Sequence, residues 1–302
     1  MTKNSLMKKQ PEISVITVNY NGLKDTERLI ESLTEHFSAA YELIVVDNGS
    51  VRNEAALLQN QFPFIQTIRS EQNLGFAAGN NLGIRQASGG YLLFLNNDTF
   101  VQDGNLSCLV REMQQKPQLG AVSPKIIFAD EKGGIQFAGY TPLTRITLRN
   151  QLIGYREQDA GQYDQPRPTP YLHGAAMLVR REVIDAAGLM PEIYFLYYEE
   201  LDWSLQIRRA GYALEYNPSA TVYHRESSST GPDSPLKAFY MTRNRLLLAR
   251  RNLGRVERLL SIVYQLCVSV PKKLFQSVVR RRWDLGKATI RGCLAYFIME
   301  SN

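Results

Sequence analysis

The 302-residue sequence has only three cysteines and three histidines, and it lacks any apolar run long enough to cross a bilayer. Cys108, Cys267 and Cys293 have no C-x-x-C spacing, which argues against a disulfide framework and a structural zinc site. The first twelve residues are polar, so they do not resemble a signal peptide. These absences predict a protein of a reducing, cytoplasmic compartment.

Charge is distributed unevenly along the chain. The net charge is +6, but residues 236–302 contain 14 basic and 3 acidic residues, a net of +11. The rest of the chain, with 21 basic and 26 acidic residues, has a net charge of −5. Basic residues among leucines suit an anionic membrane surface, and the alternative is a solvated helical face packed on the main domain. We favour the membrane and expect no nucleic acid as a partner.

Strand and helix signals alternate in the first third of the chain. Helical spacing predicts helices at 25–37 and 76–87, and apolar, β-rich runs predict the strands around them, at 13–18, 43–46, 65–69 and 91–95. Beyond residue 120 the pattern predicts strands at 122–128 and 175–180 and a helix at 199–210. The alternation predicts an α/β fold with a mostly parallel central sheet flanked by helices.

The same patterns suggest how the chain is divided. We expect a flexible tail at 1–11, a main domain at 12–235 and a helical, basic, amphipathic extension at 236–302. The main domain would have two halves, 12–128 and 129–235. Within the second half, the polar segment 144–170 is long for a connection and is expected to be mobile or to face a second substrate. A flexible loop is expected at 225–235.

Polar clusters follow three of the predicted strands and should converge, because ligands bind at the carboxyl ends of strands in such sheets. The clusters are Thr17 with Asn19, Asp47 with Asn48, and Asn96 with Asn97 and Asp98. Asp98 could bind a hard cation such as Mg²⁺ or Mn²⁺, although a strand-end turn explains it equally well. Asp47 could accept from the imide N–H of a pyrimidine, although an Asx-turn is the alternative.

A glycine- and amide-rich segment, NLGFAAGNN at 73–81, opens the second predicted helix. Its glycines would let backbone approach a ligand, and helix N-terminal N–H groups favour anions. A plain helix start would look similar. The candidate ligand-binding residues are Asn73, Gly75, Phe76 and Asn80.

Three acids, Glu199, Glu200 and Asp202, follow an aromatic stretch, YFLYY at 194–198. Capping explains one or two acids at a helix start, but three behind aromatic residues are less expected. Helical spacing places Glu199 and Asp202 on one face and Glu200 on another, so their roles should differ. His224 follows a short apolar, strand-like segment at 220–223 and could be a metal ligand, although a single histidine is more often structural.

Taken in order, these motifs resemble glycosyltransferase family 2, over residues 13–251. The resemblance is closest to the rhamnosyltransferase-like branch that acts in bacterial surface polysaccharide assembly. It rests on VNYN at 18–21, VVDNGS at 45–50, the 73–81 segment, LNND at 95–98, HGA at 173–175, YEELD at 198–202 and His224.

The resemblance implies a GT-A fold, an activated sugar donor and a divalent cation. Asp47 would contact the base, Asp98 and His224 would bind the metal, and Glu200 would be the catalytic base. Two positions depart from the family pattern: Asn96 replaces the first Asp of D-x-D, and Glu200 replaces the more usual Asp. Acceptor-binding or supporting roles would fall to His173, Gly174, Tyr198, Glu199, Asp202 and Trp203.

The expected activity is inverting, metal-dependent transfer of a sugar, with L-rhamnose from dTDP-rhamnose as the first candidate and UDP- or GDP-sugars as alternatives. The acceptor would be a glycan or a polyprenyl-diphosphate-linked sugar, reached at the inner face of the cytoplasmic membrane, and a homo-oligomer is possible. A non-catalytic polyanion- or membrane-binding scaffold would leave the strand-end carboxylates unexplained. A sugar nucleotidyltransferase ranks low, because the first strand is followed by NYNGL, without arginine.

Overall fold

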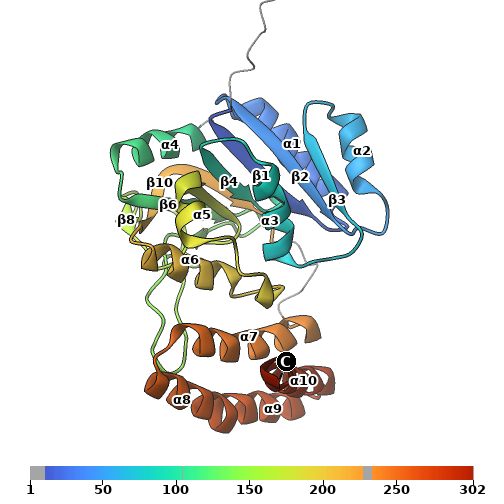
Figure 1. Ribbon diagram of the computed structural model, residues 1–302, viewed down its shortest axis with the longest axis vertical. Coiled ribbons are helices and arrows are strands. Elements are labelled where there is room, and N and C mark those ends of the chain that lie inside the picture. The colour runs from blue at the N-terminus through green and yellow to red at the C-terminus, as the bar shows by residue number, and fades with distance from the viewer. Residues whose placement is uncertain (1–10, 104, 227–232, 302) are drawn as a thin grey trace, which may run out of the picture.

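The computed structural model describes residues 11–103, 105–226 and 233–301, and a ten-stranded sheet lies at its centre (Figure 1). Eight strands follow the order β3-β2-β1-β4-β9-β6-β10-β5, while β7 pairs with β6 and β8 pairs with β10. The strands are β1 (Ile13–Asn19), β2 (Tyr41–Asn48), β3 (Gln66–Ser70), β4 (Tyr91–Leu95), β5 (Thr99–Phe100), β6 (Leu119–Phe128), β7 (Ile135–Phe137), β8 (Arg167–Pro168), β9 (Ala176–Arg180) and β10 (Ala213–His224).

Helices cover both faces of the sheet. One face carries α1 (Leu23–His36), α2 (Glu54–Gln61) and α4 (Leu106–Gln115), and the other carries α3 (Phe76–Gln86), α5 (Arg181–Ala187) and α6 (Glu199–Arg209). Strand β4 shows why both faces need covering, because successive side chains point to opposite sides. Leu93 and Leu95 join the first apolar layer, and Leu92 and Phe94 join the second.

Most strands run in one direction. β1 is parallel to β2 and β4, β2 is parallel to β3, and β6 is parallel to β10. β9 lies antiparallel between β4 and β6, so β6 and β10 run in the same direction as β4. The predicted α/β class, with a mostly parallel sheet flanked by helices, is confirmed.

The last strand is longer than the sequence pattern predicted. The strand-like segment expected just before His224 is the end of the 12-residue strand β10. The pattern is broken at Pro218, which has no N–H to donate to a ladder. The pairing with β6 shifts its register between Asn217 and Thr221, and the strand continues to pair with β6 from Thr221 onward. Because of this bulge, the sequence pattern indicated only the part of the strand that follows it.

The C-terminal helices lie beside the sheet layer, below it in Figure 1. They are α7 (Pro235–Asn252), α8 (Arg255–Tyr264), a π turn (Gln265–Ser269), α9 (Val270–Val279) and α10 (Trp283–Ser301), so the predicted helical extension is confirmed. Leu246–Ala249 of α7 pack with Leu201 of α6, with Tyr194 and Tyr198 from the segment before it, and with Tyr296 of α10. No helix among the described residues is long and apolar enough to span a membrane.

Two predicted flexible segments lie largely outside the described residues: all but Pro11 of the tail, and 227–232 of the loop at 225–235. The long polar segment 144–170 is described and is held by hydrogen bonds. Leu152 forms a β-bridge with Tyr140, and the backbone N–H of Ile153 donates to Gly139 at 2.9 Å. This segment therefore folds back as a hairpin-like arm.

Candidate active site

Asp98 and His224 meet at one edge of the sheet although they are distant in the chain. β5 follows Asp98 directly and pairs antiparallel with the end of β10, so Thr99 lies opposite His224. His224 Nε2 lies 3.0 Å from an Asp98 carboxylate oxygen, and both side chains are buried. His224 Nδ1 lies 2.7 Å from Oε1 of Gln136 on β7. The two metal-ligand candidates are therefore neighbours.

The chemistry of this pair fits part of a cation site. When Nδ1–H of His224 donates to Gln136, the lone pair of Nε2 faces the negatively charged Asp98 carboxylate. Either a second ring proton or a bound cation is then needed between the two groups. Ligating histidines commonly donate their other N–H in this way. The described residues contain no group of three His, Cys, Asp or Glu that could hold a metal. A divalent cation would therefore draw its remaining ligands from diphosphate oxygens and water.

Asp47 is fully buried at the end of β2. Its carboxylate accepts from the backbone N–H groups of Ser50 at 3.0 Å and Ala55 at 3.1 Å, and Arg69 lies 3.4 Å from it. Ala55 belongs to the first turn of α2, where the helix dipole favours a negative charge. The local-turn alternative fits these contacts, and the base contact stays a prediction.

Asn48 holds the segment that leads into α3. Its amide donates to the Asn73 side chain at 3.2 Å and to the Gly75 carbonyl at 3.0 Å, and it accepts from Leu74 N–H at 3.1 Å. Gly75 has φ of +86°, and a Cβ there would lie 2.3 Å from the carbonyl oxygen of Phe195. Glycine is thus required where the two segments touch, as the N–H of Phe76 donates to that carbonyl at 2.7 Å.

Most of the other residues predicted to bind the sugar donor form hydrogen bonds within the protein. Asn19 donates to Glu54 at 2.8 Å and accepts from Thr26 at 2.8 Å, and the Asn97 amide donates to Thr26 at 3.1 Å. Asn80 donates to the Phe76 carbonyl at 3.0 Å, and Asn96 N–H donates to Ala175. Thr17 is buried with no partner for its hydroxyl among the described residues. Their predicted contacts with a donor remain predictions.

The three acids at the start of α6 have different surroundings, as helical spacing predicted. Asp202 is buried and pairs with Arg251 at 2.6 Å and Asn252 at 2.9 Å, both on α7. Glu199 is also buried, and burial, with repulsion from Glu200, raises its pKa well above the usual range. Glu200 is partly exposed, and desolvation raises its pKa to about 7. Asp202 thus ties α6 to α7, while Glu200 can exchange a proton near neutral pH.

The aromatic stretch before these acids is held in an unusual backbone conformation. Phe195, Tyr197 and Tyr198 all have positive φ, which is rare for bulky residues. The side-chain amide of Asn244, on α7, lies within 2.8–3.0 Å of the carbonyl oxygens of Tyr194, Leu196 and Tyr197. Sequence inspection missed Asn244, because nothing local marks a residue almost fifty positions from its partners.

Glu200 lines a cavity of about 630 Å³ between the main domain and the C-terminal helices. Tyr140, Tyr197 and Tyr198 line it as well, together with Arg149–Asn150 and Leu152 of the hairpin-like arm and with residues of α7 and α9. Trp203, by contrast, is fully buried against Phe94 in the sheet core and supports α6 from behind.

His173 lies between this cavity and the Asp98–His224 pair. Its ring stacks on Tyr140 with centroids 6.2 Å apart and meets the His224 ring edge-on at 6.5 Å. Desolvation lowers the pKa of His173 to about 3, so the ring is neutral. A Cβ on Gly174 would lie 3.8 Å from Cγ of Glu200. The structure thus brings together residues from the β4–β5 turn, β10, the 173–174 turn and α6.

The chain belongs to glycosyl transferase family 2, whose family model matches residues 14–188. The resemblance seen in the motifs is therefore confirmed, and the protein is a glycosyltransferase. The N-acetylglucosaminyl-diphospho-decaprenol L-rhamnosyltransferase of Mycobacterium tuberculosis is 26% identical over 269 residues, which are 80% of this chain and 85% of that protein. Protein y4gI of Sinorhizobium fredii is 28% identical over 76% of this chain, but the chain spans only 26% of its length.

A third relative is the O-antigen biosynthesis protein RfbC of Myxococcus xanthus, 26% identical over 76% of this chain and 18% of that protein. Among solved structures, the mannosyltransferase PcManGT from Pyrobaculum calidifontis, in complex with GDP-Man and Mn²⁺, superposes with a TM-score of 0.59. The match covers 96% of this chain and 88% of that one at 14% identity, and it shows that the fold is GT-A.

Proposed function

We propose that this glycosyltransferase is inverting and metal-dependent, and that it transfers L-rhamnose from dTDP-rhamnose to a glycan or polyprenyl-diphosphate-linked acceptor of a cell-surface polysaccharide. The names of the M. tuberculosis and M. xanthus relatives support the sugar and the setting. A UDP-sugar is the second candidate donor. In this proposal, residues 12–128 bind the donor, 129–235 serve the acceptor and catalysis, and 236–302 form the extension.

The observation that carries the proposal is the position of Glu200. A carboxylate whose pKa is near 7 lines a large cavity, and His173 separates that cavity from the Asp98–His224 pair. Glu200 would remove the proton from an acceptor hydroxyl. As it does so, the hydroxyl oxygen would bond to the anomeric carbon of the donor sugar, and the bond from that carbon to the diphosphate would break. A divalent cation held by Asp98 and His224 would offset the charge that gathers on the leaving diphosphate.

We further propose that the extension contacts the inner face of the cytoplasmic membrane. Large apolar side chains are exposed on three consecutive helices: Val256 and Leu259 on α8, Phe275 and Val279 on α9, and Trp283 on α10, each 59–72% exposed. Arg280 and Arg281 lie close to them in the chain and are exposed too. Apolar side chains beside basic ones favour an anionic lipid surface.

The test is calorimetric titration of the full chain with dTDP, UDP and GDP, each with and without Mn²⁺. We expect Mn²⁺-dependent binding of dTDP, and weaker binding to Asp98→Ala. Binding of no nucleotide under either condition would contradict the proposal and favour a non-catalytic scaffold. Tighter binding of UDP than of dTDP would retain the activity and overturn the rhamnose assignment.

A further inference from the structure

The cavity beside Glu200 is lined by five basic side chains from three parts of the chain. Arg149 comes from the hairpin-like arm, Lys237 and Arg245 from α7, and Lys272 and Lys273 from α9. Among the described residues that line the cavity, Glu200 is the one acid. None of the five basic residues forms an ion pair with a carboxylate in the described parts of the chain.

Three of these cations are held in place without being neutralised. The Lys273 ammonium donates to the Thr242 hydroxyl at 2.9 Å, and Arg245 Nε donates to the Tyr198 hydroxyl at 2.8 Å. Lys237 lies over the Tyr197 ring, 5.9 Å from its centroid. Hydroxyls and an aromatic face orient a positive charge, but they do not cancel it. The positive charge of the cluster is therefore not balanced by these contacts.

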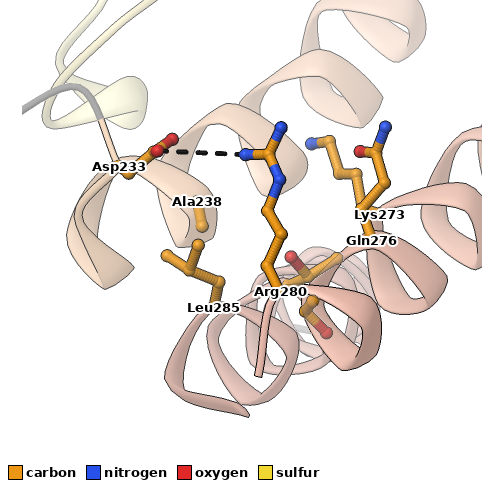
Figure 2. Close-up of a pocket in the computed structure, with 8 residues that line it drawn as sticks. Asp233, Ala238, Lys273, Gln276, Arg280 and Leu285 are labelled. Carbon is orange, nitrogen blue, oxygen red and sulfur yellow. Dashed lines mark ion pairs between the residues drawn. The ribbon is translucent and has the colours of Figure 1, made fainter. Parts of the chain in front are cut away.

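Lys273 is also affected by the positive charges of its neighbours. Desolvation lowers its pKa to about 8, with the positive charges of Arg245 and Arg149 as further causes. A bound anion would reverse the second contribution. A neighbouring cavity of about 140 Å³, which Lys273 and Gln276 also line, contains a basic residue that does have an acidic partner. There Arg280 reaches the Asp233 carboxylate at 3.9 Å, an acidic partner that the five basic residues of the larger cavity lack in the described parts of the chain (Figure 2).

We propose that the cavity binds a phosphate-bearing group of the acceptor, a diphosphate in particular, with Arg149, Lys237, Arg245, Lys272 and Lys273 as its counter-charges. This inference rests on the proposed glycosyl transfer. Arginine and lysine suit phosphate oxygens, and the cavity is larger than one phosphate requires. The tyrosines beside Glu200 would contact the acceptor sugar, so its hydroxyl faces Glu200 while its charged end lies among the basic residues.

The probe for this site is inorganic pyrophosphate, titrated calorimetrically into the full chain in the presence of EDTA, so that no metal site contributes. We expect wild-type protein to bind it, and we expect binding to weaken about tenfold or more in Lys272→Gln/Lys273→Gln. Arg149→Gln, on the hairpin-like arm, should weaken it as well. The matched control is Lys287→Gln/Arg291→Gln, which removes two exposed charges from α10 and should bind as wild type does.

The outcomes separate this inference from the proposed function. Equal affinity of the cavity variants and the control, or no pyrophosphate binding by wild type, overturns the anion site even when nucleotide binding with Mn²⁺ is intact. Loss of nucleotide binding by wild type overturns the proposed function instead. Unchanged nucleotide binding by Lys272→Gln/Lys273→Gln, together with weaker pyrophosphate binding, is the expected result and shows that the variant is folded.

A lipid headgroup could supply the same phosphate chemistry, so a second arm uses vesicles containing phosphatidylglycerol. We expect pyrophosphate, at concentrations that fill the site, to leave vesicle co-sedimentation unchanged, because the acceptor's own phosphate is the ligand. Release of the protein from vesicles by pyrophosphate, matched by the same loss in Lys272→Gln/Lys273→Gln, would assign the cavity to bulk lipid and overturn the acceptor assignment.

Discussion

The neighbouring carboxyls Glu199 and Glu200 differ in access to the cavity, and this difference gives a paired prediction. Glu200→Gln removes the group that accepts the acceptor's proton, so we expect transfer to fall about 100-fold or more with nucleotide affinity unchanged. Glu199→Gln, a buried neighbour that does not line the cavity, should retain much more activity. Steady-state kinetics with calorimetry distinguishes them. Near-full turnover by Glu200→Gln would move the base role to Glu199.

The raised pKa of Glu200 also predicts how activity and stability vary with pH. A base works when deprotonated, so log kcat/KM should rise with pH and level off above about 7. The folded-state pKa exceeds the usual carboxyl value, so between about 4.5 and 7 the folded state binds more protons than the unfolded state. The free energy of unfolding therefore falls as pH rises through this window.

Glu200→Gln should reduce that fall, because only the Glu199 contribution remains, and it should be more stable than wild type at pH 8, by about 1–3 kcal/mol. Denaturant unfolding at pH 5 and pH 8 checks it. Equal pH dependence in both proteins would mean that the Glu200 carboxyl is not desolvated in the folded state.

Asn244 is the residue on which the backbone before α6 depends. Removing its amide leaves the carbonyls of Tyr194, Leu196 and Tyr197 without this donor, so Asn244→Ala should lose about 1–3 kcal/mol. Asn244→Asp should lose more, because it places a negative charge against carbonyl oxygens. Thermal unfolding of both variants tests the order. Wild-type stability in Asn244→Asp would show that the segment holds its conformation unaided.

At the level of single residues, the sequence was informative where a motif was local. The acids at 199–202 were separated correctly into two faces, because helical geometry alone decides that. Gln136 and Asn244 could not be found in this way. Their partners lie 88 and almost 50 residues away, and only the completed sheet and helix packing bring them together.

The start of α3 gives a prediction at the scale of an element. Gly75 has φ of +86° and no room for a Cβ beside the Phe195 carbonyl, so Gly75→Ala must displace either α3 or the 194–198 segment. We expect lower thermal stability and weaker nucleotide binding. Gly174→Ala is the matched control, because its Cβ would make ordinary contacts at 3.8 Å and beyond. Equal damage in both variants would contradict this account.

Strands and helices of the first 95 residues were predictable, since apolar periodicity and β-rich composition agree there. The pairing of β5 with β10 and the antiparallel insertion of β9 between β4 and β6 were not. Sheet order depends on contacts between distant segments, and no local pattern encodes it. The candidate metal pair depends on that pairing, so sequence motifs suggested Asp98 and His224 separately but could not show that they touch.

For the molecule as a whole, the C-terminal helices cannot be treated as a detachable tail. Tyr296 of α10 is buried with Leu246 and Leu247 of α7, and Arg251 of α7 pairs with the buried carboxylate of Asp202 on α6. Deleting the extension would expose this core and leave Asp202 without its cation. Lower membrane binding by a truncated protein could then reflect misfolding, so point substitutions on the exposed face are the sharper test.

Phe275→Ser/Val279→Ser changes two side chains that are 69% and 65% exposed, one turn apart on α9. If they enter a lipid surface, removing them should reduce co-sedimentation with phosphatidylglycerol vesicles about tenfold or more, because each apolar side chain contributes roughly 1.5–3 kcal/mol. The matched control, Phe64→Ser/Val51→Ser, alters the same residue types at 57% and 88% exposure, in the segments on either side of α2, a helix that lies far from α9 in Figure 1. Equal sedimentation of the two variants would mean that the exposed face of α8–α10 has no role in lipid binding. A loss confined to the α9 variant would instead place the cavity beside Glu200 next to the bilayer that carries the acceptor.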